Sequence, residues 1–265
     1  MKSLLFTVDL EEFVAQEFDV DVPREMCFEL AKKGFSVLLG LMKRNGIKAT
    51  LFTTLEFAEF CPSLIEEALK DGHELGLHAL KHKHRYGKMA EEDALRFLTE
   101  AKKKLEERFN VTIVSFRGPQ MSRPSYAVLE DLGIRYDSSY HPTYVPGKYN
   151  LFFKTRAIHS HGKVTVVPVS VTPLLRLPFS WIWFRNMGFW YTQFCSSWVL
   201  RKSNYINVYF HPWEFVDVSG FKGKISTLIV GKTGNSLIHK VEDYFHWLKS
   251  KGVESKTFKE FMHGR

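Results

Sequence analysis

Long apolar stretches are missing from this sequence. A membrane-spanning helix needs about 20 consecutive apolar residues, and charged residues interrupt every hydrophobic stretch here before it reaches that length. The apolar run near the N-terminus meets Asp9, which is too early for the apolar core of a signal peptide. We therefore expect no signal peptide, no transmembrane segment and a cytoplasmic location.

Cysteine is also scarce. The chain of 265 residues has three cysteines, Cys27, Cys61 and Cys195, which lie far apart and form no CxxC pair. Neither a disulfide framework nor a cysteine zinc site is expected from such spacing. The low cysteine content fits a reducing compartment.

Acidic residues are fewer than basic ones, 29 against 37, so the net charge is +8. Such a charge could attract a phosphate-bearing ligand, nucleic acid or an anionic membrane surface, but a solvated basic surface is the simpler explanation. Because no nucleic-acid-binding motif accompanies the charge, we expect no nucleic-acid partner. The sequence leaves the oligomeric state open.

Short apolar segments alternate with helical patterns along the chain. Strands are expected at residues 3–8, 48–53, 74–77, 112–116, 134–136, 164–169 and 206–210, and helices at 24–45, 62–71, 91–109, 125–132 and 237–248. This alternation is typical of parallel βαβ units. With about seven strands it predicts an α/β fold, a distorted (β/α) barrel in a single domain spanning residues 1–265. Residues 220–235 are expected to form a long loop.

Polar residues follow several of the expected strands directly. In a barrel the carboxyl ends of parallel strands meet at one rim, where catalytic residues usually lie. We therefore expect these residues to lie near one another. They are Asp9, His78, Arg117, Asp137 and His211.

Two carboxylates follow the first strand. Asp9 and Glu11 are two residues apart, and such residues share a face of an extended chain. One could hold a metal while the other accepts a proton, although a charged turn is the plainer alternative. Glu12 has the opposite phase and is expected in solvent.

The densest histidine cluster follows the third strand. His78 and His82 are four residues apart, so one helical turn or a tight loop brings them together. Neutral imidazole is a common zinc ligand, and with one carboxylate these two would supply the three protein ligands of a catalytic metal. A basic loop that happens to be rich in histidine is the alternative. His73 and His84 are expected to be structural or solvent-facing.

Three further residues suit catalysis when taken together. Arg117 could pair with a carboxylate and keep it ionised. Asp137 could equally cap a turn, and His211 could act as a general acid. Taken singly, each is as readily explained as a structural residue.

In their order along the chain, these motifs resemble those of the polysaccharide deacetylases, carbohydrate esterase family four. The resemblance covers residues 7 to about 247. Residues 7–11, TVDLE, are similar to the Asp-x-Glu variant of the family's first motif, and residues 78–82 to its His-(Ser/Thr)-x-x-His motif, with Ala79 replacing the hydroxyl residue. The third, fourth and fifth motifs are matched by Arg117, Asp137 and His211.

One branch of this family, associated with exopolysaccharide and exosortase gene clusters, carries Phe-His-Pro-Trp-Glu-Phe, which stands here at residues 210–215. It also has a Leu-Pro-Phe segment before an aromatic run, and residues 177–185 resemble it. Trp181 and Ile182 replace glycines that are usual there, so the substrate groove is expected to be narrower or differently shaped. The expected substrate-binding residues are Pro119, Leu177, Phe179, Arg185 and Trp213.

The resemblance implies a metal-dependent hydrolase that removes N-acetyl groups from an amino sugar or polysaccharide and releases acetate. Asp9 would be the base, kept ionised by Arg117, and a backbone amide just after Arg117 would help to stabilise the oxyanion. His211 would protonate the leaving amine, with Asp137 raising its pKa. A divalent metal, with Zn²⁺ expected first and iron or cobalt as alternatives, would be held by Glu11, His78 and His82.

The substrate and the aromatic segment 173–200 leave alternatives open. That segment could be core, which is favoured, or a sugar-stacking or lipid-facing surface. A lipid- or nucleotide-linked amino sugar, with peripheral membrane contact, is a further hypothesis. The rival functions are an allantoinase-like hydrolase of a non-sugar C–N bond and a catalytically inactive carbohydrate-binding protein on the same fold.

Overall fold

A computed structural model describes residues 2–145 and 149–264 of the protein. Its centre is a curled β-sheet with the strand order β10-β1-β2-β3-β4-β5-β9-β8. Every neighbouring pair from β10 to β9 is parallel, so this run has the predicted number of about seven parallel strands. In addition, β11 pairs parallel with β1, and β8 pairs antiparallel with β9. The strands are β1 Lys2–Leu10, β2 Ala49–Thr54, β3 Glu74–Ala79, β4 Ser115–Phe116, β5 Tyr136–Asp137, β8 His159–His161, β9 Val164–Val166, β10 Tyr205–Phe210 and β11 Val253–Ser255.

Hydrogen bonds between β10 and the segment that follows β9 join the first and last strands of the parallel run. Ser170 N donates to Asn207 O at 2.8 Å, and Asn207 N donates to Ser170 Oγ at 2.9 Å. Asn207 Nδ2 also donates to Val167 O at 3.2 Å. Because Asn207 lies in β10, these bonds bring the last parallel strand back to the first, and the predicted distorted barrel is confirmed.

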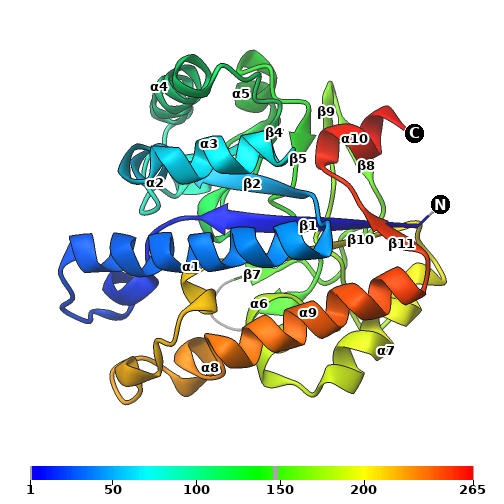
Figure 1. The fold of residues 1–265 in the computed structure, drawn as a ribbon. Helices are drawn as coiled ribbons and strands as arrows, with labels where there is room; N and C mark the ends of the chain where they lie inside the picture. The colour runs from blue at the N-terminus through cyan, green and yellow to red at the C-terminus, as the bar shows by residue number, and fades with distance from the viewer. Residues whose placement is uncertain (1, 146–148, 265) are drawn as a thin grey trace.

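Helices cover the outside of the curled sheet, and α1 and α9 lie side by side against it (Figure 1). Gly46 adopts φ +61° and ends α1 where the sequence predicted, since glycine tolerates the left-handed conformation. The helices are α1 Arg24–Asn45, α2 Leu55–Phe60, α3 Pro62–Lys70, α4 Glu91–Phe109, α5 Tyr126–Asp131, α6 Trp181–Asn186, α7 Phe189–Leu200, α8 Thr227–Val230, α9 Asn235–Ser250 and α10 Phe258–His263. The 3₁₀ turns are η1 Val14–Phe18, η2 Tyr86–Lys88, η3 Pro119–Met121, η4 Pro212–Phe215 and η5 Ser219–Phe221.

Some elements differ from the sequence prediction. The strands expected at 112–116 and 134–136 contribute only two residues each to the sheet, as β4 and β5. The expected loop 220–235 contains the helix α8. A small antiparallel hairpin, β6 Tyr144–Val145 and β7 Tyr149–Asn150, lies apart from the main sheet. Elements this short carry too few residues for a periodic pattern.

The core holds the first strand firmly. Every residue from Ser3 to Leu10 is buried, and Phe6 packs against Phe210 of β10 and Phe245 of α9 with ring centroids 5.4 and 5.1 Å away. Burying a side chain of this size contributes roughly 1.5–3 kcal/mol. The end of β1, where Asp9 lies, is therefore held by a fully buried strand.

Both chain ends lie where β1 begins, so the carboxyl ends of the parallel strands face the opposite end of the barrel (Figure 1). Cys27, Cys61 and Cys195 are buried and free. Within the described ranges no helix combines the length and the apolar character needed to cross a membrane.

Candidate functional site

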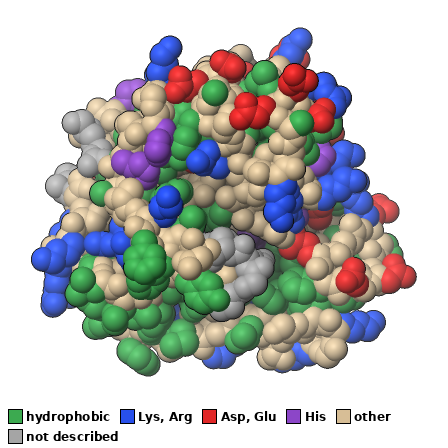
Figure 2. All heavy atoms as spheres, turned by 180° about the vertical axis from the view of Figure 1, so that it is seen from behind, with side chains coloured by type: hydrophobic (Ala, Val, Ile, Leu, Met, Phe, Trp, Pro, Cys, Tyr) green, Lys and Arg blue, Asp and Glu red, His purple; other side chains and the backbone are tan. Residues whose placement is uncertain are grey.

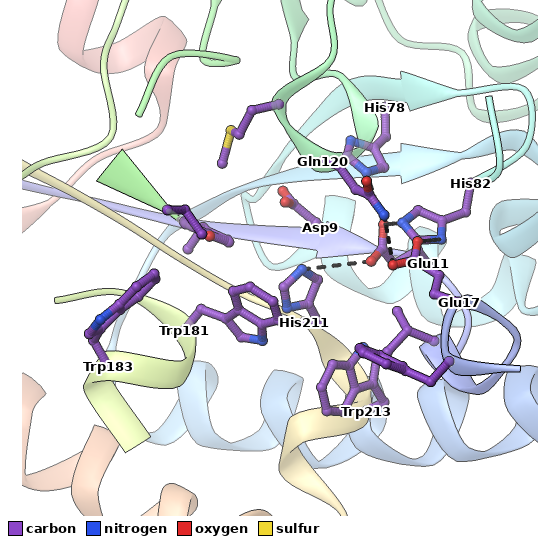
Figure 3. A pocket seen from close by; sticks show the side chains of 15 residues that line it. Asp9, Glu11, Glu17, His78, His82, Gln120, Trp181, Trp183, His211 and Trp213 are labelled. Atoms are coloured by element: carbon purple, nitrogen blue, oxygen red, sulfur yellow. Dashed lines mark hydrogen bonds and ion pairs between the residues drawn. The ribbon is translucent and has the colours of Figure 1, made fainter. Parts of the chain in front are cut away.

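A pocket opens at the carboxyl ends of β1, β3 and β10 (Figure 3). Its walls combine ionisable side chains with large aromatic rings. The ionisable residues lining it are Asp9, Glu11, Glu17, His78, His82 and His211, and the aromatic ones are Phe18, Trp181, Trp183, Tyr209 and Trp213.

Three of the ionisable groups meet at one point. Glu11 Oε2 lies 2.9 Å from His78 Nε2 and 2.9 Å from His82 Nε2. All three side chains are buried, and one ligand atom from each lies within 4.8 Å of the others. The expected metal ligands are thus brought together, with His78 at the end of β3 and His82 in the turn after it.

The tautomer of His78 indicates a cation at this point. His78 Nδ1 lies 2.5 Å from the carbonyl oxygen of Arg117, which can only accept, so Nδ1 carries a hydrogen. In the neutral ring the lone pair of Nε2 then faces Glu11 Oε2, and two acceptors would repel each other. A metal ion between the two atoms would satisfy both, so these donors fit a metal.

The charges of Glu11 and His82 are strongly coupled. Burial opposes ionisation of Glu11, but His82, His78 and His211 together hold its pKa well below the usual range. Burial would lower the pKa of His82, yet the Glu11 charge and hydrogen bond raise it to about 9. Without a metal the two groups therefore form an ion pair, and a metal would displace the proton of His82.

Glu17 of η1 supports the cluster from outside. Its Oε1 lies 3.5 Å from His82 Nδ1 and accepts from Arg85 at 2.9 Å. Its Oε2 accepts from Gln120 Nε2 at 2.7 Å. Metal-binding histidines commonly have such a carboxylate on their second nitrogen. Neither Glu17 nor Gln120 was predicted from the sequence.

Asp9 is held beside the three ligands by Arg117. The guanidinium is fully buried and donates to Asp9 Oδ1 and Thr7 Oγ1, each at 2.8 Å, and to Ser138 Oγ at 2.8 Å. It also lies 4.6 Å from the ring centroid of Phe52. The pairing of Arg117 with a carboxylate, expected from the sequence, is present.

His211 has a carboxylate partner, and it is Glu214. His211 Nδ1 lies 3.0 Å from Glu214 Oε1, which also accepts from the His211 backbone amide at 2.8 Å. Nε2 lies 3.6 Å from Glu11 Oε1, inside the pocket (Figure 3). Although burial disfavours the charged ring, the hydrogen bond to Glu214 and the charges of Glu11, Glu214 and Asp9 raise the pKa of His211.

Asp137 contacts Ser139 and Arg123, whereas the sequence prediction paired it with His211. Its Oδ1 accepts from Ser139 N at 2.9 Å, and its Oδ2 lies 3.7 Å from Arg123 Nε. Burial raises the pKa of Asp137 itself. The expectation that Asp137 raises the pKa of His211 is corrected, because Glu214 makes that contact.

The backbone amide just after Arg117 already donates a hydrogen bond within the protein. Gly118 N donates to Ser139 Oγ at 2.8 Å, and Pro119 has no amide hydrogen. The expected oxyanion contact cannot come from these two positions. The next amide belongs to Gln120, whose side chain lines the pocket.

The expected substrate-binding residues divide between pocket and core. Trp213 lines the pocket and stacks on His211 with ring centroids 5.6 Å apart. Pro119 is buried in η3, and Leu177 is partly buried against the core. Phe179 is 0% exposed and Arg185 2%, and neither lines the pocket, so their contact with substrate stays a prediction. They belong to the core that supports the pocket.

Arg185 contacts Glu214 instead of solvent. Arg185 Nε lies 2.6 Å from Glu214 Oε2, without the angle of a hydrogen bond, and both side chains are fully buried. Its other nitrogens donate to the carbonyls of Gly231 and Ile229, each at 2.7 Å. The pair links α6, η4 and the turn after α8.

The prediction that Glu12 is exposed to solvent is wrong. Glu12 is mostly enclosed, and burial raises its pKa. The extended chain of β1 ends at Leu10, so the alternation of faces no longer applies at Glu12.

His73 and His84, which were expected to be structural or solvent-facing, are structural. His73 Nδ1 accepts from Ala49 N at 3.1 Å, and His84 stacks on Phe97.

Comparisons with known proteins give a partial family match and a shared fold. The sequence model of the polysaccharide deacetylase family matches residues 11–136, just under half of the chain. Among curated proteins no sequence matches significantly. The match begins at Glu11 and includes both histidines of the cluster, but it does not reach Asp9 or His211.

Several solved structures share the fold. A probable polysaccharide deacetylase from Pseudomonas aeruginosa PAO1 is 17% identical, with a TM-score of 0.66 over 97% of this chain and 88% of that chain. A family 4 carbohydrate esterase from Streptomyces lividans is 14% identical, with a TM-score of 0.55 over 97% and 92%.

A third similar structure is a CE4 family pseudoenzyme from Bacillus anthracis, 12% identical, with a TM-score of 0.57 over 98% of this chain. The chain spans 64% of the length of that protein, less than two thirds. A mutant of the pseudoenzyme has restored enzymatic activity. The family model thus matches part of the chain, and these structures show the fold that the chain shares with them.

Proposed function

We propose that this protein is a polysaccharide deacetylase of the exosortase-associated branch, a metal-dependent hydrolase that removes N-acetyl groups from an amino sugar or polysaccharide. One observation carries the proposal: Glu11, His78 and His82 converge on one point in a pocket that also holds Asp9 and His211. The family model over residues 11–136 supports it. The products would be acetate and a free amine.

Glu11, His78 and His82 would hold a divalent metal. Two imidazole nitrogens and a carboxylate are a usual set for catalytic zinc, with the remaining position open to water. A metal held by these residues would supply Lewis-acid chemistry for polarising the acetamide carbonyl and for making water more acidic. Nitrogen and oxygen donors suit several transition metals, so zinc is the first candidate to test.

Asp9 would accept the proton of the attacking water. Arg117 fixes the orientation of this carboxylate at 2.8 Å and is itself anchored by Thr7 and Ser138. A base held in place in this way needs no reorganisation when the proton moves. Asp137 would act at a distance, because it holds Ser139, whose hydroxyl fixes the turn after Arg117.

His211 would give a proton to the leaving nitrogen as the C–N bond breaks. Glu214 accepts from Nδ1, so Nε2 is the nitrogen that faces the pocket. The raised pKa of His211 favours the protonated ring that a general acid needs.

The aromatic walls suit an amino sugar. Trp181, Trp183 and Trp213 line the pocket, and sugar rings have apolar faces that stack on aromatic side chains. Trp181 stands where the related sequences have glycine, which favours a narrow groove. We include in the proposal a cytoplasmic location, peripheral membrane contact, and a substrate whose amino sugar is linked to a lipid or a nucleotide.

Acetate release from N-acetylglucosamine, its nucleotide-linked form and a lipid-linked form tests the proposal. Asp9→Asn and His211→Ala should each lower kcat by about 10²–10⁴-fold, while Lys103→Gln on the exposed face of α4 leaves it unchanged. Chelation should abolish activity and Zn²⁺ should restore it. Near wild-type turnover in either active-site variant would overturn these roles.

The same assays separate the rival functions. Turnover of allantoin without acetate release would identify a hydrolase of a non-sugar C–N bond. A purified protein that binds sugar, lacks metal and releases no acetate would identify a catalytically inactive carbohydrate-binding protein. One of the similar structures is a pseudoenzyme.

A further inference from the structure

Helix α7 presents an apolar stripe to solvent. The helix has no charged residue over its 12 positions. Met187, just before it, is 40% exposed, Trp190 67% and Phe194 50%. Trp198 lies beside Phe194, with ring centroids 5.5 Å apart. These residues are three or four positions apart and therefore share one helix face.

The stripe continues onto α8 and ends in basic residues. Asn186 Nδ2 donates to the carbonyl of Leu228 at 2.9 Å, and the Leu228 side chain is 59% exposed. At the other end Arg201 and Lys202 follow α7 directly and are both exposed. The sequence favoured a core position for residues 173–200. This prediction therefore holds for only part of the segment.

The whole net charge of the protein comes from the segment of the sequence that contains this stripe. Between Asp137 and Glu214 there is no acidic residue, whereas eight basic residues lie there, which equals the net charge of +8. Among the seven of these residues that the structure describes, Arg185 alone is paired with a carboxylate, that of Glu214 in the core. Figure 2 shows hydrophobic side chains gathered at the lower left, over α7, beside Lys and Arg, while Asp and Glu lie along the top and right.

Aromatic side chains beside basic ones, on a helix too short to span a bilayer, suit the membrane interface. Trp and Phe rings settle at the level of the lipid headgroups, and Lys and Arg are attracted to anionic lipids. A second copy of this chain is a poorer occupant, because two faces of the same positive charge would repel each other.

We propose that the α7 face, defined as Met187, Trp190, Phe194, Trp198, Arg201 and Lys202, docks on the surface of an anionic lipid bilayer. Docking itself is independent of the proposed catalysis. If that function holds, docking also brings the pocket to the bilayer, because α6, which supplies Trp181 and Trp183 to the pocket, is followed by α7 after only Met187 and Gly188.

Co-sedimentation with vesicles tests the docking. The protein should bind vesicles of phosphatidylcholine mixed with phosphatidylglycerol, bind phosphatidylcholine alone weakly, and dissociate as salt rises, because exposed charges are screened. The double variants Trp190→Ser/Phe194→Ser and Arg201→Gln/Lys202→Gln should each lower the partition coefficient by about tenfold or more.

Matched controls lie elsewhere on the surface. Met26 of α1 is 49% exposed, and Lys103 and Lys104 of α4 are exposed, so Met26→Ser and Lys103→Gln/Lys104→Gln should bind as wild type. Asp9→Asn should also bind as wild type, so a failure of the catalytic proposal leaves this result intact. Circular dichroism establishes that each variant is folded.

Three results would overturn the proposal. One is the absence of binding to anionic vesicles at low salt. Another is equal binding by the wild type and both α7 variants. The third is a dimer in sedimentation velocity that Trp190→Ser/Phe194→Ser abolishes, since this result assigns the face to a second copy of the chain.

Discussion

His211 and Glu214 are joined twice, because the carboxylate of Glu214 accepts from both the ring Nδ1 and the backbone amide of His211, at 3.0 and 2.8 Å. The two residues lie at opposite ends of the short turn η4. Arg185 contacts the second carboxylate oxygen from inside the core at 2.6 Å. His211 is thereby held in one orientation and one tautomer by a residue three positions further along.

Replacing Glu214 by Gln should therefore impair catalysis more than substrate binding. The amide offers Nδ1 a weaker acceptor and leaves Arg185 buried beside a neutral group, so we expect kcat to fall by about 10²-fold and KM to change little. Steady-state acetate release measures both constants. Glu214→Asp should restore part of kcat, and Glu107→Gln on α4 should behave as wild type. An unchanged kcat in Glu214→Gln would contradict the role.

Removing Arg185 should reduce stability. Arg185→Met leaves the Glu214 carboxylate buried without a cation, and breaking a buried pair in this way costs roughly 3–5 kcal/mol. Urea unfolding of the metal-free protein measures the loss. The double variant Arg185→Met/Glu214→Gln should recover part of it, because no uncompensated charge then remains. Additive losses in the double variant would argue against the pairing.

Zinc affinity should rise with pH up to about 9. The pKa of His82 lies at about 9 in the metal-free protein because Glu11, although opposed by burial, stabilises its charged form. A metal binds the neutral ring and must displace that proton. Below pH 9 the affinity should therefore fall by about tenfold per pH unit for the one proton released. Competition titrations with a zinc chromophore between pH 6.5 and 9 measure this slope. A flat profile would contradict the coupling.

The stability of the metal-free protein should change with pH in the opposite sense. Because the folded-state pKa of His82 is raised from 6.5 to about 9, its contribution is complete below pH 6.5 and is lost as pH rises toward 9. The lowered pKa of Glu11 acts at the acid side, where its contribution is present above 4.5 and is lost at lower pH. Thermal unfolding of chelated wild type and His82→Gln should differ in slope between pH 6.5 and 9. Parallel curves would contradict this assignment.

Strong periodicity made much of the fold predictable. The helices at 24–45 and 91–109 coincide with α1 and α4, because each has a clear apolar face and a recognisable end. The cluster of Glu11, His78 and His82 was predictable because strand ends meet at one rim, which brings Glu11 to His78. The distance of 2.9 Å between Glu11 Oε2 and His78 Nε2 depends on tertiary packing.

The partner of His211 was not predictable with the same certainty. The order of motifs along a chain carries no distances, so Asp137 was chosen, although Glu214 lies three residues from His211 in a sequence that suits a capping box. Helix α7 was not predicted from the sequence. Apolar residues occur on most of its sides, so the sequence shows no helical periodicity there. Arg185 was placed in the groove because burial of an arginine cannot be seen without its partner.

Two glycines of α1 provide a last test of how the helix supports the site. A Cβ at Gly34 would lie 1.9 Å from the carbonyl oxygen of Pro212, the residue next to His211, whereas a Cβ at Gly40 would meet nothing within 4 Å. Gly34→Ala should push η4 away, lower stability by about 1–3 kcal/mol and reduce kcat through the displaced His211. Gly40→Ala should stabilise the helix by roughly 0.5–1 kcal/mol and leave kcat unchanged. Chemical unfolding and acetate release on both variants distinguish these effects. Equal behaviour of the two alanine variants would mean that contact between α1 and η4 does not position His211.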